Sequence, residues 1–399
     1  MTGAPPTIVL TFNGGSSSLK FGLFDVSDDT ATPLLTGQIE TLGGDAVQLR
    51  ATDARGQSLA DHRLEDAAPS TWTQHVVDLL DRAALPDAQV IGHRLVHGGP
   101  HLSAPVRIDD AVLHRLEAAR GFAPLHIPEA LATIRAAQAH FPDRPQVACF
   151  DTHFHAAMPA VAKTLPIPAM LRDTGLHRYG FHGLSCESIV RQLGADLPER
   201  LIIAHLGNGA SVTAVRGGRS VDTSMGLTPT GGIIMGRRSG DLDPGLLLHL
   251  MREHGYTAET LETLLDHQSG LLGISGIDSD MRRLKEAAPT HAEARLAIAM
   301  FCRALGKTIA AMAHVLSGVD LIVFSGGIGE HDPGVRATVG ADLAWAGVTI
   351  DAARNRGGEG RISADHSVVT VRIVPAQEDA EIARHAARVM TCAAERIAS

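Results

Sequence analysis

The chain has 399 residues, more than one typical hydrophobic core supports, which favours two domains. Hydrophobic residues make up 44% and charged residues 20%, so the chain is globular rather than disordered. A formal net charge of −9, with 35 scattered Lys and Arg residues, argues against a nucleic-acid-binding surface. Any phosphate bound here is therefore expected to be a small one, held in a cleft.

The cysteines and the N-terminus favour an intracellular protein. The four cysteines lie far apart and form no CxxC pair, which argues against a disulfide framework or a cysteine zinc site. The start, MTGAPPTIVL, lacks the basic residues and long apolar core of a signal peptide. We find no run of about 20 apolar residues that would span a bilayer. The sequence therefore predicts a cytoplasmic protein without a membrane partner.

Strands and helices alternate along the chain. The first runs, TIVLTF and LKFGLFDV, are β-rich, and two more such runs continue an antiparallel sheet. Helical spacing follows at residues 70–83, 109–120 and 128–140, with buried strands at 88–99 and 145–154. The second half repeats the pattern, with strands at 200–218, 320–325 and 367–374 and helices at 183–193, 244–255, 257–268, 291–317 and the C-terminus. This order is typical of an α/β protein.

One internal echo indicates a duplication. IVLTFNGGSSSLKFGLF and LIIAHLGNGASVTAVRG share an apolar strand, a turn of Gly, Asn and Ser, and a second apolar strand. They lie about half the chain apart, which excludes a fixed-period solenoid. A duplicated α/β domain with a cleft between the copies explains the echo. Two such hairpins could hold a polyphosphate from both sides.

The glycine-rich turns are candidate phosphate loops. Backbone N–H groups in a tight Gly/Ser turn converge on an anion, and Asn13, Ser16, Ser18 and Lys20 would add polar groups. A plain β-turn is the alternative for this stretch alone, but the echo at 205–211 favours phosphate. FSGGIGE, at 324–330, follows a buried strand and is a third glycine turn where an α/β fold binds ligands. The LGKT sequence is no Walker loop, because Phe301 occupies the required glycine position.

Several charged residues suggest phosphoryl transfer. Arg94 lies within an apolar strand, His182 in an aromatic turn, and Arg237 and Arg238 before a Ser-Gly-Asp helix entry. Each arginine alone could form an ion pair, but together with the glycine turns they favour a phosphoryl group as the common target. Asp151 follows a buried strand and is a candidate active-site carboxylate. The His153-x-His155 pair beside it could bind zinc, but the sequence shows no third ligand.

Taken together, the motifs resemble those of the acetate, propionate and butyrate kinases of the actin-like ATPase superfamily. The resemblance runs almost end to end and rests on NGGSSSLKF, GHRLVHGG, APLHIP, CFDTHFH, RYGFHG, HLGNGASV, DTSMGLTP, GRRSGDLDP, SGLLGISGIDSDMR, FSGGIGE and VPAQED. It implies two duplicated actin-like (ribonuclease H-like) α/β domains with an active-site cleft between them. The implied limits are 1–153 plus 381–399 for the N-terminal, acyl-binding domain and 154–380 for the nucleotide-binding domain. A homodimer is also implied, with small-molecule partners only.

The resemblance assigns roles to individual residues. Asp151, His182 and Arg238 are the implied catalytic residues. Asn13 and Glu378 are implied to lie at a Mg²⁺ ion, with Mn²⁺ as its alternative. Arg94 is implied to bind the substrate carboxylate, and its alkyl end is assigned to Val96, Leu125, Phe181 and Pro229. The implied nucleotide-binding residues are Ser16, Ser18, Lys20, His205, Leu206, Gly207, Asn208, Gly209, Asp280, Met281, Arg282, Gly327, Ile328, Gly329, Glu330 and His331.

The implied activity is reversible, Mg²⁺-dependent in-line phosphoryl transfer between ATP and acetate, giving acetyl phosphate and ADP. A carboxylate with a pKa near ~4 is already ionised at pH 7 and needs no base, so Asp151 is predicted to orient groups rather than to remove a proton. The alternative is a propionate or butyrate kinase with a roomier pocket. A non-catalytic actin-like nucleotide-binding protein is a further alternative, against which Arg94, Asp151, His182 and Arg238 argue.

Three positions depart from the family's usual pattern. Ile127 stands where the family generally has Asn, Gly232 where it has Glu, and Arg237 where it has Thr. We expect these residues to surround the acyl pocket and the cleft. They therefore leave the preferred acyl chain length open.

Overall fold

The computed structural model describes residues 6–15, 18–42, 46–64, 71–83, 85–124, 126–358 and 360–398. The chain divides into two compact units. The first comprises Met1–Ala156, Gly183–Ser188 and Gln377–Ser399, and the second comprises Ala157–His182 and Ile189–Ala376. The C-terminal residues thus return to the N-terminal unit. The functional division predicted from the sequence stays a prediction.

A sheet with the strand order β5-β4-β3-β2-β1-β6-β8-β7 forms the first unit. Its strands are β1 (Thr7–Gly15), β2 (Ser18–Ser27), β3 (Thr30–Leu42), β4 (Ala46–Asp53), β5 (Ser58–Leu64), β6 (Val90–Leu95), β7 (Val106–Arg107) and β8 (Gln146–Phe150). The strands from β5 to β1 pair antiparallel, whereas β1, β6 and β8 are parallel to one another. Parallel pairing places the carboxyl ends of β1, β6 and β8 at one edge of the sheet.

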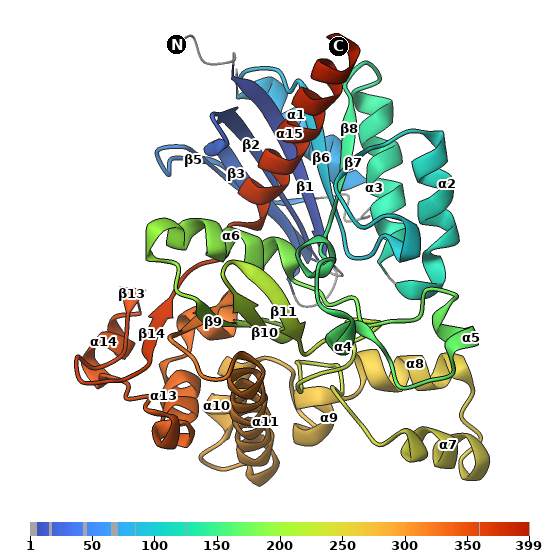
Figure 1. Cartoon of the computed structure of the whole chain (residues 1–399). Coiled ribbons are helices and arrows are strands. Elements are labelled where there is room, and N and C mark those ends of the chain that lie inside the picture. Colours follow the sequence, from blue (N-terminus) through green and yellow to red (C-terminus); the bar gives the residue numbers. More distant parts are fainter. Residues whose placement is uncertain are drawn as a thin grey trace. The chain divides into compact units, whose positions relative to one another are not determined.

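Helices cover both faces of this sheet (Figure 1). They are α1 (Trp72–Arg82), α2 (Asp110–Ala118), α3 (Ile127–His140) and α15 (Glu378–Ala398). Because alternate strand residues face opposite sides, Leu10 packs in a cluster with Trp72 of α1, and Val9 packs in a cluster with Ile382 of α15. The C-terminal helix therefore supplies part of the core of the first unit.

The second unit is built around the sheet β11-β10-β9-β12-β14-β13. Its strands are β9 (Arg200–Leu206), β10 (Ala210–Arg216), β11 (Arg219–Thr223), β12 (Leu321–Ser325), β13 (Gly360–Arg361) and β14 (Thr370–Ile373). Its helices are α4 (Ala160–Lys163), α5 (Ala169–Arg172), α7 (Pro244–Glu253), α8 (Ala258–His267), α9 (Gly270–Ser275), α10 (Met281–Ala287), α11 (Ala292–Leu316), α12 (Gly326–His331), α13 (Pro333–Asp342) and α14 (Ala352–Gly357). Helix α6 (Gly183–Leu193) begins in the first unit and ends in the second.

The two sheets repeat one plan, as the internal echo predicts. In the first, β1 is antiparallel to β2 and parallel to β6, which is parallel to β8. In the second, β9 is antiparallel to β10 and parallel to β12, which is parallel to β14. The predicted duplicated α/β fold is confirmed.

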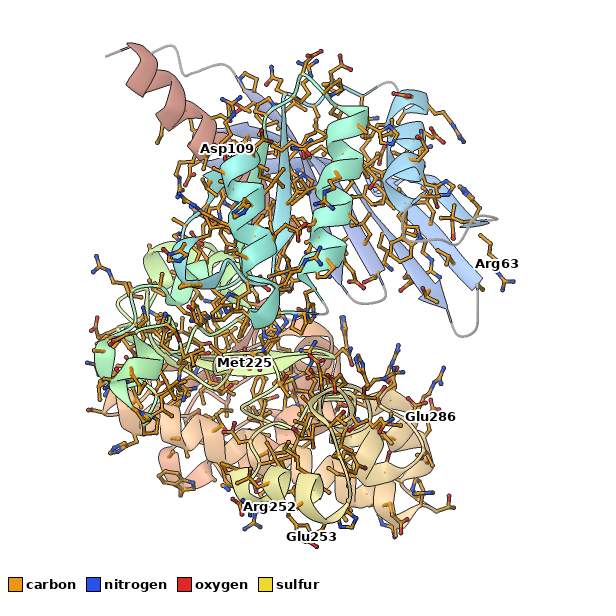
Figure 2. All side chains as sticks on the ribbon, turned by 90° about the vertical axis from the view of Figure 1, so that its right-hand side faces the viewer. Arg63, Asp109, Met225, Arg252, Glu253 and Glu286 are labelled. Carbon is orange, nitrogen blue, oxygen red and sulfur yellow. The ribbon has the colours of Figure 1, made fainter. Side chains whose placement is uncertain are left out.

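Two helices of the second unit differ in how far their side chains are buried. Helix α11 meets the length and hydropathy of a membrane span, so the expectation that no such run exists is wrong for this segment. The core helix of a soluble protein passes the same test, and α11 buries Phe301, Leu305 and Ile309 while packing against β9 and β10. None of the residues of α7, all of them described, is buried. Figure 2 shows Arg252 and Glu253, at its end, pointing outward.

Candidate functional site

The first hairpin places Asn13 and Lys20 directly opposite each other. Strands β1 and β2 pair as far as Gly15 and Ser18, and Asn13 is the cross-strand partner of Lys20. Asn13 is buried and Lys20 is exposed. The predicted phosphate-binding Ser16, between the two strands, lies outside the described residues. The hairpin therefore offers an exposed cation beside a buried amide, as a phosphate and metal site would require.

Asn13 joins the hairpin to the start of the C-terminal helix. Its amide Nδ2 donates to Glu378 Oε2 at 3.1 Å and to Asp379 Oδ1 at 3.0 Å. Asn13 and Glu378, predicted to lie at one metal ion, are thus brought together. Asp379 was not among the predicted residues, although it follows Glu378 directly. Burial, and then the neighbouring Glu378 charge, raises the pKa of Asp379.

Arg94, which is half-buried, forms an ion pair with the buried Asp151 at the ends of β6 and β8. Arg94 Nη2 and Nε donate to Asp151 Oδ2 at 2.5 and 3.0 Å. Nη1 donates to Asn13 Oδ1 at 3.3 Å and to the Gly14 carbonyl at 3.0 Å. A guanidinium has five N–H groups, so these bonds leave one for a ligand. Asn13 and Arg94 lie near the carboxyl ends of β1 and β6, and Asp151 directly follows β8. Because these strands are parallel neighbours, the three residues share the edge at which α/β sheets bind ligands.

The protonation of this pair is set by burial and charge. Desolvation opposes the charged form of Arg94, but Asp151, Glu378 and Asp379 outweigh it and raise the guanidinium pKa. Arg94 is therefore positively charged at every accessible pH. For Asp151, burial is the largest effect and raises the pKa, the Arg94 charge opposes it, and Glu378 adds to it. The Arg94 cation thus favours the charged form of a carboxyl group whose pKa burial raises.

A pocket of about 180 Å³ lies beside Arg94 within the first unit. Its lining includes Gly14 and Ser18 of the hairpin, Arg94, Val96, and the apolar Phe12 and Trp72. The predicted substrate residues Arg94 and Val96 therefore line one pocket, whose walls are largely apolar and also include Glu129. Such a pocket suits a short carboxylic acid, since charge and alkyl group each find a matching surface.

In the second unit, His182 is fixed by its backbone and by two side chains. It precedes α6 with the left-handed φ of 59°. Its Nδ1 lies 2.9 Å from Ser211 Oγ, and its ring stacks on His205 with centroids 4.3 Å apart. A left-handed conformation is costly for a residue other than glycine and is kept only where the surroundings determine it. The predicted His182 and His205 thus form one rigid pair.

Gly209 brings His182 and Arg238 together. A Cβ atom on Gly209 would lie 3.3 Å from Arg238 Nη1 and 3.3 Å from His182 Nε2. Arg238 Nη1 also donates to the Pro229 carbonyl at 3.3 Å. The predicted Pro229 therefore holds Arg238 through its backbone. The Arg238 guanidinium and the His182 imidazole converge on a glycine turn, and such an arrangement suits phosphoryl oxygens.

The two glycine turns of the second unit leave the same sheet edge. Strands β9 and β12 are parallel, with His205 paired to Ser325. The turn at 207–209 follows β9 and the predicted nucleoside-binding segment 327–331 follows β12. Between them Gly326 has a φ of 76°, and a Cβ there would meet the Leu206 carbonyl oxygen at 2.8 Å. Only glycine allows the two turns to approach this closely.

The predicted nucleoside segment at 280–282 begins α10. Asp280 caps this helix by accepting from the Arg282 backbone N–H, and its carboxylate pairs with the exposed Arg282 side chain at 2.7 Å. Arg282 is the first cause of the lowered pKa of Asp280. Arg237 Nε lies 3.5 Å from the hydroxyl of the preceding Ser279. Arg237, which stands where the family usually has Thr, thus neighbours a predicted nucleoside segment.

The remaining predicted residues and two of the departures lie elsewhere in the two units. Phe181 is buried in the second unit, and Leu125 lies outside the described residues. Ile127 is 1% exposed and packs in the core with Leu131 and Phe150. It does not line the pocket beside Arg94, and its place around the acyl pocket stays a prediction. Gly232, with a φ of 94°, has no room for a Cβ against the Ser224 carbonyl. Ile127 and Gly232 therefore have local packing roles.

The carboxylates of the first unit fit a hard divalent cation. Glu378 and Asp379 converge on Asn13, and Asp151 Oδ1 is buried without a hydrogen-bond partner among the described residues. Oxygen ligands of this kind are those that Mg²⁺ prefers. A buried carboxylate oxygen without a partner is costly, and a cation or its water would satisfy it.

The duplicated sheets, with charged side chains and glycine turns at their strand ends, define the class: a two-unit α/β protein with the actin-like ATPase fold. The chain belongs to the Acetokinase family, whose model matches residues 8–384.

Named relatives and solved structures agree with this assignment. The chain is 41% identical to the acetate kinase of Methylocella silvestris over 94% of this chain and 96% of that protein. It is 42% identical to the acetate kinase of Shewanella loihica over 96% and 99%. Among solved structures it is similar to a propionate kinase from Francisella tularensis, with a TM-score of 0.88 and 34% identity, over 96% of this chain and 100% of that one. The acetate kinase of Porphyromonas gingivalis gives a TM-score of 0.83 at the same identity and coverage.

Proposed function

We propose that this chain is an acetate kinase, which transfers the γ-phosphoryl group of ATP to acetate and reverses the reaction from acetyl phosphate and ADP. The observation that carries the proposal is the half-buried Arg94, which keeps one N–H for a ligand and lines a pocket with largely apolar walls. The relatives named acetate kinase support the choice of substrate.

The proposed steps follow from the charges of these residues. Arg94 binds one carboxylate oxygen of acetate, whose other oxygen attacks the γ-phosphorus in line. Asp151 holds the Arg94 guanidinium in place and removes no proton, because acetate is already ionised. Arg238 and His182 neutralise charge on the equatorial phosphoryl oxygens as the bond to ADP breaks. That residues of both units act on the same substrates stays a prediction.

The nucleotide is assigned to the second unit and to the first hairpin. Lys20 and the turn 205–209 are proposed for its phosphates, and 280–282 and 327–331 for its nucleoside. Asn13, Glu378 and Asp379 would hold Mg²⁺, or Mn²⁺ in its place. When bound, this ion neutralises the nucleotide phosphates. An Asp379→Asn variant is expected to weaken Mg²⁺ binding at least ~10-fold in calorimetry, whereas Asp61→Asn, on the exposed strand β5, should not.

The deciding experiment measures kcat/KM for formate, acetate, propionate and butyrate with ATP and Mg²⁺, trapping the acyl phosphate with hydroxylamine. Preference for acetate supports the proposal. Preference for propionate supports the second candidate, which the structural similarity to a propionate kinase favours. One methylene changes the discrimination by only ~1–3 kcal/mol, so the full series is needed. ATP binding without any transfer would indicate a nucleotide-binding protein instead.

The homodimer and the cytoplasmic location inferred from the sequence are part of the same proposal. Light scattering on the purified chain tests the dimer, and fractionation of the producing cell tests the location. A monomer at all concentrations would contradict the first, and recovery with the membrane fraction the second.

A further inference from the structure

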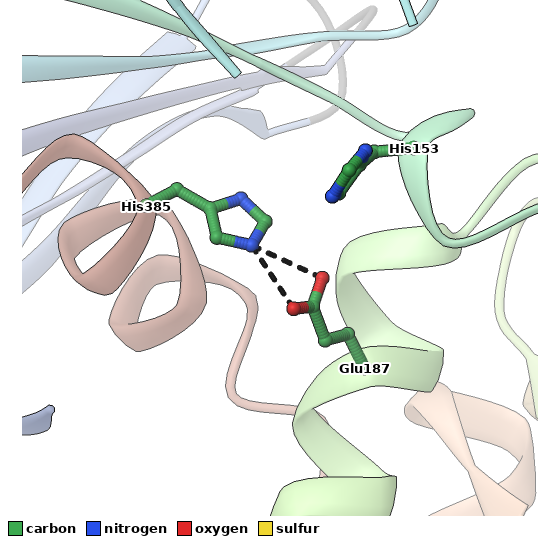
Figure 3. A group of neighbouring side chains, drawn as sticks. All are labelled: His153, Glu187 and His385. Carbon is green, nitrogen blue, oxygen red and sulfur yellow. Dashed lines mark hydrogen bonds and ion pairs between the residues drawn. The ribbon is translucent and has the colours of Figure 1, made fainter. Parts of the chain in front are cut away.

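Three side chains from distant parts of the sequence meet in the first unit (Figure 3). His153 lies in the 3-10 turn His153–His155 after β8, Glu187 in α6, and His385 in α15. One ligand atom from each lies within 4.8 Å of the other two. None of the three has a role in the proposed phosphoryl transfer. We propose that His153, Glu187 and His385 bind a divalent transition metal ion of the Zn²⁺ type.

Two of the three ligands are already in contact. His385 Nε2 lies 3.1 Å from both carboxylate oxygens of Glu187. The His153 and His385 rings meet edge to face, with centroids 5.5 Å apart. His385 is 2% exposed, and its Nδ1 is buried without a hydrogen-bond partner among the described residues. A buried ring nitrogen in this state is costly.

The hydrogen bond of His153 prepares its other nitrogen for a metal. His153 Nδ1 lies 2.8 Å from the Ser103 carbonyl oxygen. A carbonyl only accepts, so Nδ1 carries the proton and Nε2 keeps its lone pair. Metal-binding histidines are oriented by this kind of bond from the opposite nitrogen to a backbone carbonyl.

The donor set selects the kind of metal. Two imidazoles and one carboxylate suit Zn²⁺, Ni²⁺, Co²⁺ or Cu²⁺, whereas Mg²⁺ and Ca²⁺ prefer oxygen ligands. Three protein ligands leave the fourth tetrahedral position to water. Zn²⁺ bonds of this kind place ligand atoms roughly 3.3 Å apart, so the half-buried His153 has to move slightly inward.

The charges around the cluster favour a cation, although one positive group lies close by. Glu381 Oε1 is 3.8 Å from His385 Nε2 and is itself bonded to Arg384. Two carboxylates and one guanidinium therefore face the imidazoles. The zinc pair suggested by the sequence, His153 with His155, is replaced by His153 with partners that only the fold supplies. His155 is fully buried and does not belong to the cluster.

The test uses the full chain, purified without a histidine tag and treated with a chelator. Co²⁺ is titrated in excess Mg²⁺, which occupies sites with oxygen ligands, and the visible absorption reports tetrahedral nitrogen coordination. Competition with a coloured indicator then gives the Zn²⁺ affinity. We expect one equivalent of Co²⁺ or Zn²⁺ per chain, and at least a ~10-fold weaker affinity in His153→Ala and Glu187→Gln.

A matched control comes from the other histidine pair of the chain. His249 and His254 lie on exposed positions of the second unit, with ring centroids 5.4 Å apart. His249→Ala should leave the affinity unchanged. Thermal melts without metal establish that the variants fold, and His153→Ala, at a half-buried position, is the safer of the two. No saturable binding by the wild-type protein, or equal binding by His153→Ala, would show that the cluster is only hydrogen-bonded and overturn the proposal.

Discussion

The two units share one strand plan but equip their strand ends differently. In the first, the ends of β1, β6 and β8 carry Asn13, Arg94 and Asp151, which are charged or polar side chains packed below the surface. In the second, the ends of β9 and β12 carry glycine turns, with His182 and Arg238 beside Gly209. A duplicated framework thus supports two kinds of site, one made from buried charge and one from exposed backbone. Changes in the first should cost stability and activity together, and changes in the second mainly activity.

The largest effect is expected from Arg94→Ala in the first unit. It leaves Asp151 buried without its cation, which costs about 3–5 kcal/mol of the free energy of unfolding. Loss of the carboxylate donor should also lower kcat/KM for acetate by about 10³-fold. Urea unfolding and the hydroxylamine assay measure both. Arg50→Ala, which removes exposed ion pairs of the same unit, should change stability by less than ~0.5 kcal/mol. An Arg94→Ala variant as stable as the wild type would refute the contrast between the two units.

Acid should destabilise the chain through His93, which precedes Arg94 in β6. Burial lowers the His93 pKa from 6.5 to about 4, and the bond to Gln146 opposes this only in part. Because the unfolded state binds the proton first, this stabilising contribution is complete above pH 6.5 and is lost as the pH falls towards 4. The loss approaches about 3 kcal/mol. His93→Gln should show a flatter dependence of the unfolding free energy on pH, and an unchanged slope would contradict the assignment.

Gly209→Ala tests the second unit. The added Cβ would press on Arg238 and His182, whose side-chain ends can shift, so the fold should survive while the donors are displaced. A displacement of this size lowers kcat/KM by about 10²-fold with little change in melting temperature. Gly357→Ala is the matched control, because nothing lies within 4 Å of its new Cβ. A large loss of stability in Gly209→Ala would remove the distinction between the units.

The smallest effect is expected from Arg237→Thr, which restores the family's usual residue. Arg237 is exposed, and its Nε lies 3.5 Å from the Ser279 hydroxyl, beside the proposed nucleoside segment. We expect KM for ATP to rise by no more than about 5-fold, as for a surface charge. The ratio of kcat/KM for acetate and propionate should stay constant. A changed ratio would place Arg237 at the acyl pocket after all.

Much of the fold could be predicted from local sequence. The duplicated sheets are indicated by the apolar strands, by the glycine turns and by the similarity of segments 8–24 and 201–217, because strand and turn signals are local. Contacts that depend on the return of the last helix could not be predicted in this way. Asp379 faces Asn13, and His385 faces Glu187, only because α15 packs on the first unit. The local pattern also could not predict that the Ile127 side chain packs in the core.

The return of α15 also has a consequence for how the chain is made. Ile382, Ala383 and Ala386 complete the core around Val9 and Val147 of the first unit. A ribosome synthesises these residues only after the whole second unit. The first unit therefore cannot finish its core until the second unit has been synthesised, although domains generally fold in the order of their synthesis. A nascent chain stalled before Gln377 should carry a protease-resistant second unit and a protease-sensitive first one.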